Sequence, residues 1–209
     1  MSIATVETKL DLEFIQPQYD FMTTEARYPA FVAGWADGKS MALILKCFEA
    51  AERYPNNLVL IVRYAFTDLR DSTMRDFEKY TGITIPSNKD VQLPNGSVIM
   101  FRHGSQLETL QNINLGAFGI EQAEEFDSDN EFQLLRGRLR REGVPHFGAI
   151  IANTNGHNWI WNLWKRHNPT RNKDFELYEA NTFDNAHNLP ADFIEDLKRM
   201  EENKDSVSI

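Results

Sequence analysis

Cysteine is almost absent from this sequence, since Cys47 is the only one in 209 residues. A single thiol excludes an internal disulfide framework and is typical of a reducing compartment. The chain also lacks any apolar run approaching the roughly 20 residues that a membrane-spanning helix needs. Its first segment carries acidic residues and no apolar stretch, so we expect no secretory signal and no membrane partner.

Positive charge is scarce as well. The chain has 22 Lys and Arg residues against 31 Asp and Glu residues, a net charge of -9 at pH 7. This balance argues against a protein that coats nucleic acid by bulk attraction, so any contact with DNA would be local or shared among subunits. The five histidines show no metal-ligand spacing and there are no cysteine pairs, so we expect no structural zinc.

Apolar runs and helical periodicity alternate along the chain. Short apolar or β-branched runs predict strands at residues 30–33, 58–62, 115–120 and 147–152. Apolar residues at helical spacing predict helices at residues 41–54, 67–80, 157–166 and 191–202. A β-hairpin is expected where two short strands flank Pro94-Asn95-Gly96. We predict an α/β fold with a mainly parallel central sheet flanked by helices and a small antiparallel hairpin insertion. Ligands bind such sheets at the carboxyl ends of the strands.

A phosphate-binding loop follows the first predicted strand. A P-loop needs inward-facing backbone N–H groups, a lysine for the β- and γ-phosphates and a hydroxyl for the metal ion. Gly38, Lys39 and Ser40 supply these parts in the right order, and the helix after them directs its positive end at the phosphates. Ala33 replaces the first glycine of the motif, with Gly34 beside it. The alternative without a nucleotide site is an ordinary strand-to-helix turn in which Gly-Lys-Ser occurs by chance.

The residues expected to line this ATP site form one continuous segment. They are Ala33, Gly34, Trp35, Ala36, Asp37, Gly38, Lys39, Ser40 and Met41.

An acidic motif ends the strand predicted before residue 121. Glu121 takes the position that is associated with Mg²⁺, together with Ser40. Gln122 takes the position where the carboxylate that orients the attacking water is expected. A glutamine can hold a water molecule but cannot accept its proton. The catalytic candidates are Lys39, Glu121, Gln122 and Glu124.

Three explanations for Gln122 are open. The residue is a natural substitution for which Glu124 or Glu125 compensates, or an engineered change that traps bound ATP, or the mark of a protein that binds ATP and hydrolyses it poorly. The alternative without a catalytic role is that Glu124 and Glu125 lie at the solvated start of a helix, where acidic side chains are favoured.

The ordered set of motifs resembles the large terminase subunits of tailed bacteriophages, in particular their N-terminal ATPase domain, the motor that packages DNA. The matching segments are Gln18, 33–40, Arg63, 69–72, the hairpin at Asn95-Gly96, 119–126, 135–140, 150–159, 179–185 and 189–194. Thr154 stands where the family usually has a proline, and Trp35 where it often has an arginine.

The resemblance implies a single P-loop NTPase domain of the ASCE type over residues 1–209. In that family an upstream glutamine reads the adenine, which would be Gln18, and Ser40 with Glu121 would hold Mg²⁺. Asn153 would sense the γ-phosphate and couple its loss to motion. An arginine finger would come from elsewhere, for example from a neighbouring subunit. The candidates for it are Arg102, Arg136, Arg138 and Arg140.

The function implied is ATP hydrolysis with Mg²⁺ that drives double-stranded DNA into a procapsid. The implied partners are DNA, the portal protein, the small terminase subunit and further copies of the chain in a ring, in the host cytoplasm at the portal vertex. Residues from about 191 would form a helix leading toward a nuclease domain, which we expect to be missing here. The alternatives are another nucleic-acid-dependent, helicase-like P-loop ATPase, or a nucleotide-binding assembly module with little turnover. With a net charge of -9 the isolated domain should bind DNA weakly.

Overall fold

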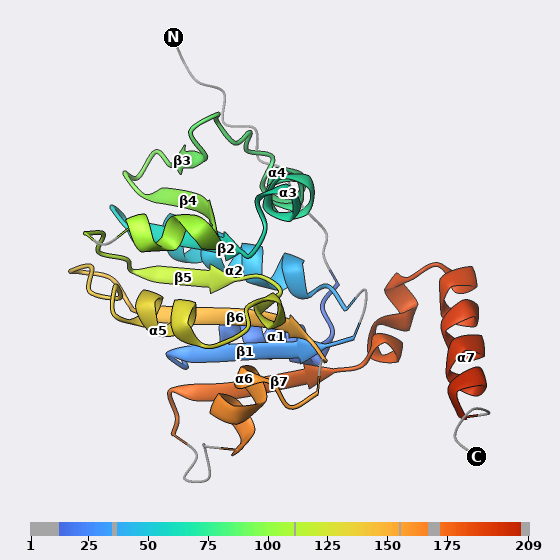
Figure 1. Cartoon of the computed structure of the whole chain (residues 1–209). Helices are drawn as coiled ribbons and strands as arrows, with labels where there is room; N and C mark the ends of the chain where they lie inside the picture. The colour runs from blue at the N-terminus through green and yellow to red at the C-terminus, as the bar shows by residue number, and fades with distance from the viewer. Residues whose placement is uncertain (1–12, 35–36, 111, 155, 167–171, 206–209) are drawn as a thin grey trace.

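The fold is built on one seven-stranded sheet with the order β3-β4-β2-β5-β6-β1-β7 (Figure 1). The computed structural model describes residues 13–34, 37–110, 112–154, 156–166 and 172–205. The strands are β1 (Tyr28–Ala33), β2 (Leu58–Arg63), β3 (Asp90–Gln92), β4 (Val98–His103), β5 (Ala117–Ile120), β6 (Phe147–Asn153) and β7 (Phe175–Ala180). Neighbouring strands are parallel except β3, which is antiparallel to β4. The carboxyl ends of the parallel strands therefore meet at one edge.

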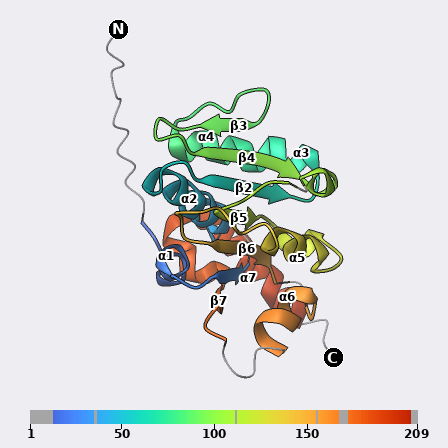
Figure 2. The ribbon, with the colours of Figure 1, turned by 90° about the vertical axis from the view of Figure 1, so that its left-hand side faces the viewer.

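Helices cover both faces of the sheet (Figures 1 and 2). The helical segments are α1 (Gln16–Thr23), α2 (Lys39–Arg53), α3 (Phe66–Asp68), η1 (Leu69–Met74), α4 (Arg75–Thr81), η2 (Gly104–Thr109), η3 (Ala123–Glu125), α5 (Asn130–Arg136), α6 (Trp159–Trp161), η4 (Asn162–Arg166), η5 (Thr182–Asn188) and α7 (Ala191–Asp205). No helix in the described part of the chain is long and apolar enough to cross a bilayer.

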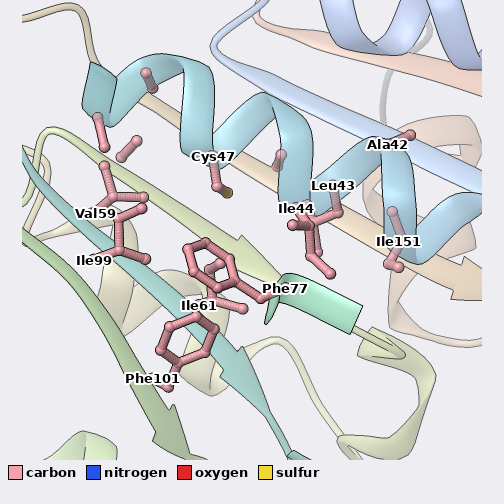
Figure 3. Packing of buried hydrophobic residues seen from close by; sticks show 14 of the residues in the cluster. Ala42, Leu43, Ile44, Cys47, Val59, Ile61, Phe77, Ile99, Phe101 and Ile151 are labelled. Carbon is pink, nitrogen blue, oxygen red and sulfur yellow. The ribbon is translucent and has the colours of Figure 1, made fainter. Parts of the chain in front are cut away.

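The hydrophobic core has two layers, one on each face of the sheet. Side chains of a strand point to opposite faces in turn. Ile61 therefore packs with Leu43 of α2 and Phe77 of α4 on one face (Figure 3). Leu60 packs on the other face, in the cluster that also holds Phe132 of α5.

The predicted fold class is confirmed. The P-loop strand β1 and the acidic strand β5 do not touch, because β6 lies between them and pairs with both. In P-loop ATPases of the ASCE type, one strand lies between the P-loop strand and the acidic strand. Strand β6 has this position here. The predicted hairpin forms between β3 and β4, but β4 also pairs with β2 in parallel, so the hairpin is the edge of the main sheet and not a separate insertion.

Helix α1 and strand β7 are among the elements that the sequence pattern does not predict. Helix α1 spans only 8 residues, with Gln18 and Phe21 as its buried positions, too few to show a helical period. Strand β7 carries half-buried or exposed residues throughout, because it pairs only with β1 and forms the sheet edge. The predicted helix at 67–80 forms as the consecutive segments α3, η1 and α4, in which η1 is a π-helical stretch of 6 residues.

Candidate active site

The P-loop joins the end of β1 to the start of α2. Helix α2 begins at Lys39, and Gly38 precedes it with a left-handed backbone at φ 63°. The positive φ favours glycine at position 38, and a Cβ atom there would lie 2.3 Å from the Nε2 atom of Gln18 and displace that amide. The turn leaves the first N–H groups of α2 available for an anion. Trp35 and Ala36 lie outside the described residues.

Lys39 folds back onto its own loop. Its Nζ atom donates a hydrogen bond to the Ala33 carbonyl at 3.1 Å and another to the Gly34 carbonyl. Burial lowers the pKa of Lys39, while the negative charges of Asp37 and Glu124 oppose that shift. The lysine is thus held at the loop by carbonyl groups that phosphate oxygens would replace as partners.

Gln18 fastens α1 to the P-loop. Its Nε2 donates to the Asp37 carbonyl at 2.7 Å, and its Oε1 accepts from the Ile15 N–H at 3.0 Å. The side chain is buried, so both ends of the amide are engaged by the chain itself. Its role in reading the adenine stays a prediction.

Ser40 and Glu121 meet as the two motifs require. The Ser40 hydroxyl donates to Glu121 Oε1 at 2.6 Å, and the Thr73 hydroxyl donates to Oε2. Glu121 is buried at the carboxyl end of β5. A carboxylate beside a hydroxyl suits Mg²⁺, a hard cation that prefers oxygen ligands. The described residues contain no cluster of three or more metal-ligating His, Cys, Asp or Glu, so phosphate oxygens and water would have to complete the shell.

Gln122 departs from ordinary backbone geometry. Its φ of 46° and ψ of 55° are left-handed, which is uncommon for a residue with a side chain. The Arg63 guanidinium donates to Gln122 Oε1 and to Glu125 Oε1, the latter at 3.4 Å. The same guanidinium lies 4.0 Å from Glu121 Oε1. Arg63 is buried at the end of β2 and therefore organises three residues of the acidic motif.

Asn153 contacts the acidic motif from the next strand. Its Nδ2 donates to Glu124 Oε1 at 2.7 Å. The other oxygen of Glu124 is buried and has no hydrogen-bond partner among the described residues. The predicted coupling residue and one of the two candidate glutamates are thus joined directly.

A cavity of about 420 Å³ opens where these groups converge. It lies at the carboxyl edge of the sheet, because its strand-end residues follow or end β5 and β6. The residues that line it are Asp37, Gly38, Lys39, Ser40, Met41, Asp76, Tyr80, Gln122, Ile151 and Asn153. Asp76 and Tyr80 come from α4 and are not among the site residues predicted from the sequence. Arg63 lies beside the cavity and contacts the acidic motif. The sequence signal for this role was a charged residue at the end of a buried apolar strand.

The four candidate finger arginines lie away from this cavity. Arg102 bonds the Asp90 carboxylate at 2.7 Å on the β3–β4 edge. The Arg136 guanidinium sits 4.5 Å from the centre of the Tyr28 ring, at the amino end of β1. Arg140 bonds the Asn114 side chain at 2.6 Å, and the Nε of Arg138 has no partner among the described residues. Within one chain Arg136 and Arg140 face the opposite edge of the sheet, so a finger role for either in a neighbouring subunit stays a prediction.

Comparison with solved structures finds bacteriophage large terminases among the similar proteins. The chain is similar to the large terminase of a thermophilic bacteriophage, at 12% identity and a TM-score of 0.72 over 90% of this chain and 50% of that one. It is similar to the HK97 bacteriophage large terminase, at 11% identity and a TM-score of 0.64 over 85% of this chain and 41% of that one. The Thermus phage P74-26 large terminase ATPase domain matches at 15% identity and a TM-score of 0.55, over 84% of this chain and 88% of that one.

These identities show a shared fold, and the chain spans 50% of the length of the thermophilic bacteriophage's large terminase. No curated protein sequence matches the chain. A family model described as phage terminase large subunit matches residues 25–208, which is most of the sequence. The chain therefore belongs to the phage terminase large subunit family.

Proposed function

We propose that this chain is the ATPase motor domain of a phage large terminase. It binds ATP with Mg²⁺ and hydrolyses the γ-phosphate to drive double-stranded DNA into a procapsid. One observation carries the proposal: a single cavity is lined by Lys39, Ser40 and Asn153, and Glu121 hydrogen-bonds Ser40 beside it. Related structures of the thermophilic bacteriophage's large terminase hold ADP and ATP-gamma-S, which supports a nucleotide as the ligand.

Each residue has a distinct task in this proposal. The α2 N-terminus and Lys39 neutralise the phosphates, because backbone N–H groups and an ammonium group converge there. Ser40 and Glu121 would hold Mg²⁺, which supplies charge neutralisation on the β- and γ-phosphates. Asn153 ends β6, which lies between β1 and β5, and it would sense the γ-phosphate.

The partners and the location that we propose rest on the family membership of the chain. We infer a ring of identical subunits around duplex DNA, docked with the portal protein and the small terminase subunit at the portal vertex in the host cytoplasm.

A second candidate function is favoured by one contact. The Arg63 guanidinium holds Gln122, which has no carboxylate, at the position where a catalytic carboxylate is expected. That contact favours a nucleotide-binding assembly module with little turnover.

An ATP titration with Mg²⁺ tests the binding step. Lys39→Ala should weaken ATP affinity by about 10- to 100-fold, because a hydrogen bond to a charged group is worth about 1.5–3 kcal/mol. Lys173→Ala is the matched control, since Lys173 is an exposed lysine just before β7 at the amino edge of the sheet. Equal affinity in both variants contradicts the P-loop assignment.

Phosphate release with and without duplex DNA separates the two candidate functions. A motor domain should release phosphate, with the rate raised by DNA and lost in Lys39→Ala. Tight ATP binding with no release under either condition would instead favour the assembly module.

A further inference from the structure

We propose that Glu124 accepts the proton of the attacking water in this chain. The inference rests on the proposed ATPase function and names the base of that same site. The acidic motif offers three side chains for this task, namely Gln122, Glu124 and Glu125, and their contacts distinguish them.

Gln122 cannot accept the proton of the attacking water, and its side chain is bonded to Arg63. A carboxamide has no basic oxygen that could take a proton at neutral pH. Its Oε1 accepts a hydrogen bond from the buried Arg63 guanidinium, and its backbone is left-handed. Arg63 extends from the end of β2 and thus fixes the side chain of Gln122.

Glu125 belongs to the same arginine cluster. Its Oε1 lies 3.4 Å from Arg63 Nη2. Burial raises the pKa of Glu125, and Arg63 lowers it, with Asp68 and Glu124 as the further charges that act on it. None of these neighbours belongs to the P-loop, so Glu125 is engaged on the side of β2 and α3.

Glu124 is engaged on the side of β6, by a residue that lines the cavity. Its Oε1 is held at 2.7 Å by Asn153, which lines the cavity. Its charge raises the pKa of Lys39, so the carboxylate lies within electrostatic reach of the P-loop lysine. Its Oε2 is buried without a partner among the described residues, and since buried polar atoms normally have a partner, we assign the attacking water to this oxygen.

The proposed chemical step forms one bond to phosphorus, breaks another and transfers one proton to Glu124. The water oxygen forms a bond to the γ-phosphorus as one water proton passes to Glu124 Oε2. The bond from the γ-phosphorus to the bridging oxygen breaks, and its electron pair stays on the β-phosphate of ADP. Glu124 afterwards returns the proton to solvent. Asn153 is a positioning residue in this scheme, because its hydrogen bond fixes the carboxylate and links it to the end of β6.

A matched pair of carboxamide variants tests the inference in the full chain. Glu124→Gln should lower the rate of phosphate release by about 100-fold or more, the usual contribution of a general base, with ATP still bound. Glu142→Gln, which makes the same change at an exposed glutamate outside the acidic motif, should stay within about 3-fold of the unchanged chain. Equal rates in the two variants overturn the inference, whereas absence of turnover in the unchanged chain counts against the proposed function.

Nucleotide selectivity gives a readout that does not need turnover. A carboxylate that faces the γ-phosphate repels it, so Glu124→Gln should bind ATP several-fold more tightly than the unchanged chain while its ADP affinity stays the same. Glu142→Gln should leave the ratio of the ATP and ADP dissociation constants unchanged. An unchanged ratio in Glu124→Gln overturns the inference even where Lys39→Ala confirms that ATP occupies the loop.

Discussion

Asp37 places a buried carboxylate inside the phosphate-binding loop. Neither of its oxygens has a hydrogen-bond partner of good geometry among the described residues, although the Gly34 backbone lowers its pKa. Burial is the largest effect and raises the pKa of Asp37 above its ordinary 3.8, Lys39 opposes the shift, and Asp184 adds to it. An acid whose pKa is higher in the folded chain destabilises the fold once the pH exceeds that pKa, and the penalty vanishes below the unfolded pKa.

Asp37→Asn should therefore stabilise the chain at pH 8. We expect a gain of about 1 kcal/mol in the free energy of unfolding, which corresponds to a rise in Tm of about 2–4 °C at this chain length. The gain should shrink as the pH falls toward 4, because the aspartate becomes protonated in the folded chain. Thermal unfolding of both proteins across this pH range measures it, and a gain that is independent of pH would contradict burial of the charge as its cause.

Single residues differ in how far the sequence predicts them. Lys39, Ser40 and Glu121 are predictable because each belongs to a motif with one chemical role, and the 2.6 Å contact between Ser40 and Glu121 brings the two motifs together. The Arg63 contacts are not predictable, because they depend on the register by which Val62 pairs with Ile120 across two strands. The choice between the two glutamates that follow Gln122 depends on the same register and on a left-handed residue before them.

Helix α2 and strand β5 approach closely at a glycine. A Cβ atom at Gly119 would lie 2.8 Å from Cys47 Sγ and 3.1 Å from Leu43 Cδ1. Both side chains belong to the face of α2 that covers the strands (Figure 3). The close approach brings the start of α2 to the end of β5, which is where Ser40 meets Glu121.

Gly119→Ala should disturb this contact. Overpacking a core typically destabilises a fold by about 1–3 kcal/mol. Gly137→Ala is the control, because its Cβ would meet only the Leu134 carbonyl at 3.4 Å and other backbone atoms further away. Urea unfolding followed by circular dichroism compares the two, and equal midpoints would show that α2 and β5 adjust at no cost.

Burial decides which elements the sequence reveals. The buried strands β2, β5 and β6 appear as apolar runs, because parallel strands covered on both faces carry few polar residues. Strand β7 has a neighbour on one side only and mixes Glu176 and Glu179 with apolar residues, so no run marks it. Its place beside β1 follows from tertiary pairing, which a local pattern does not contain.

The whole molecule divides into a sheet with its covering helices and a peripheral C-terminal helix. Helix α7 stands apart from the sheet in Figure 1, beyond the carboxyl ends of the strands. None of residues 191–200 is buried, and Met200 is 54% exposed. The segment η5 before it is different, because a Cβ atom at Gly34 would lie 2.4 Å from Thr182 Oγ1. The P-loop therefore lies against η5 at Gly34.

Two truncations separate these contributions. A chain ending at residue 190 should keep its Tm within about 2 °C and its ATP affinity, because removing an exposed helix forfeits little buried apolar area. A chain ending at residue 180 also loses Thr182 and the buried Asn185, so we expect a lower Tm and weaker ATP binding. Thermal unfolding and ATP titration of both chains measure this difference. Loss of ATP binding already in the longer truncate would mean that α7 contributes to the site, whereas its retention leaves η5 as the segment that supports the loop from the C-terminal side.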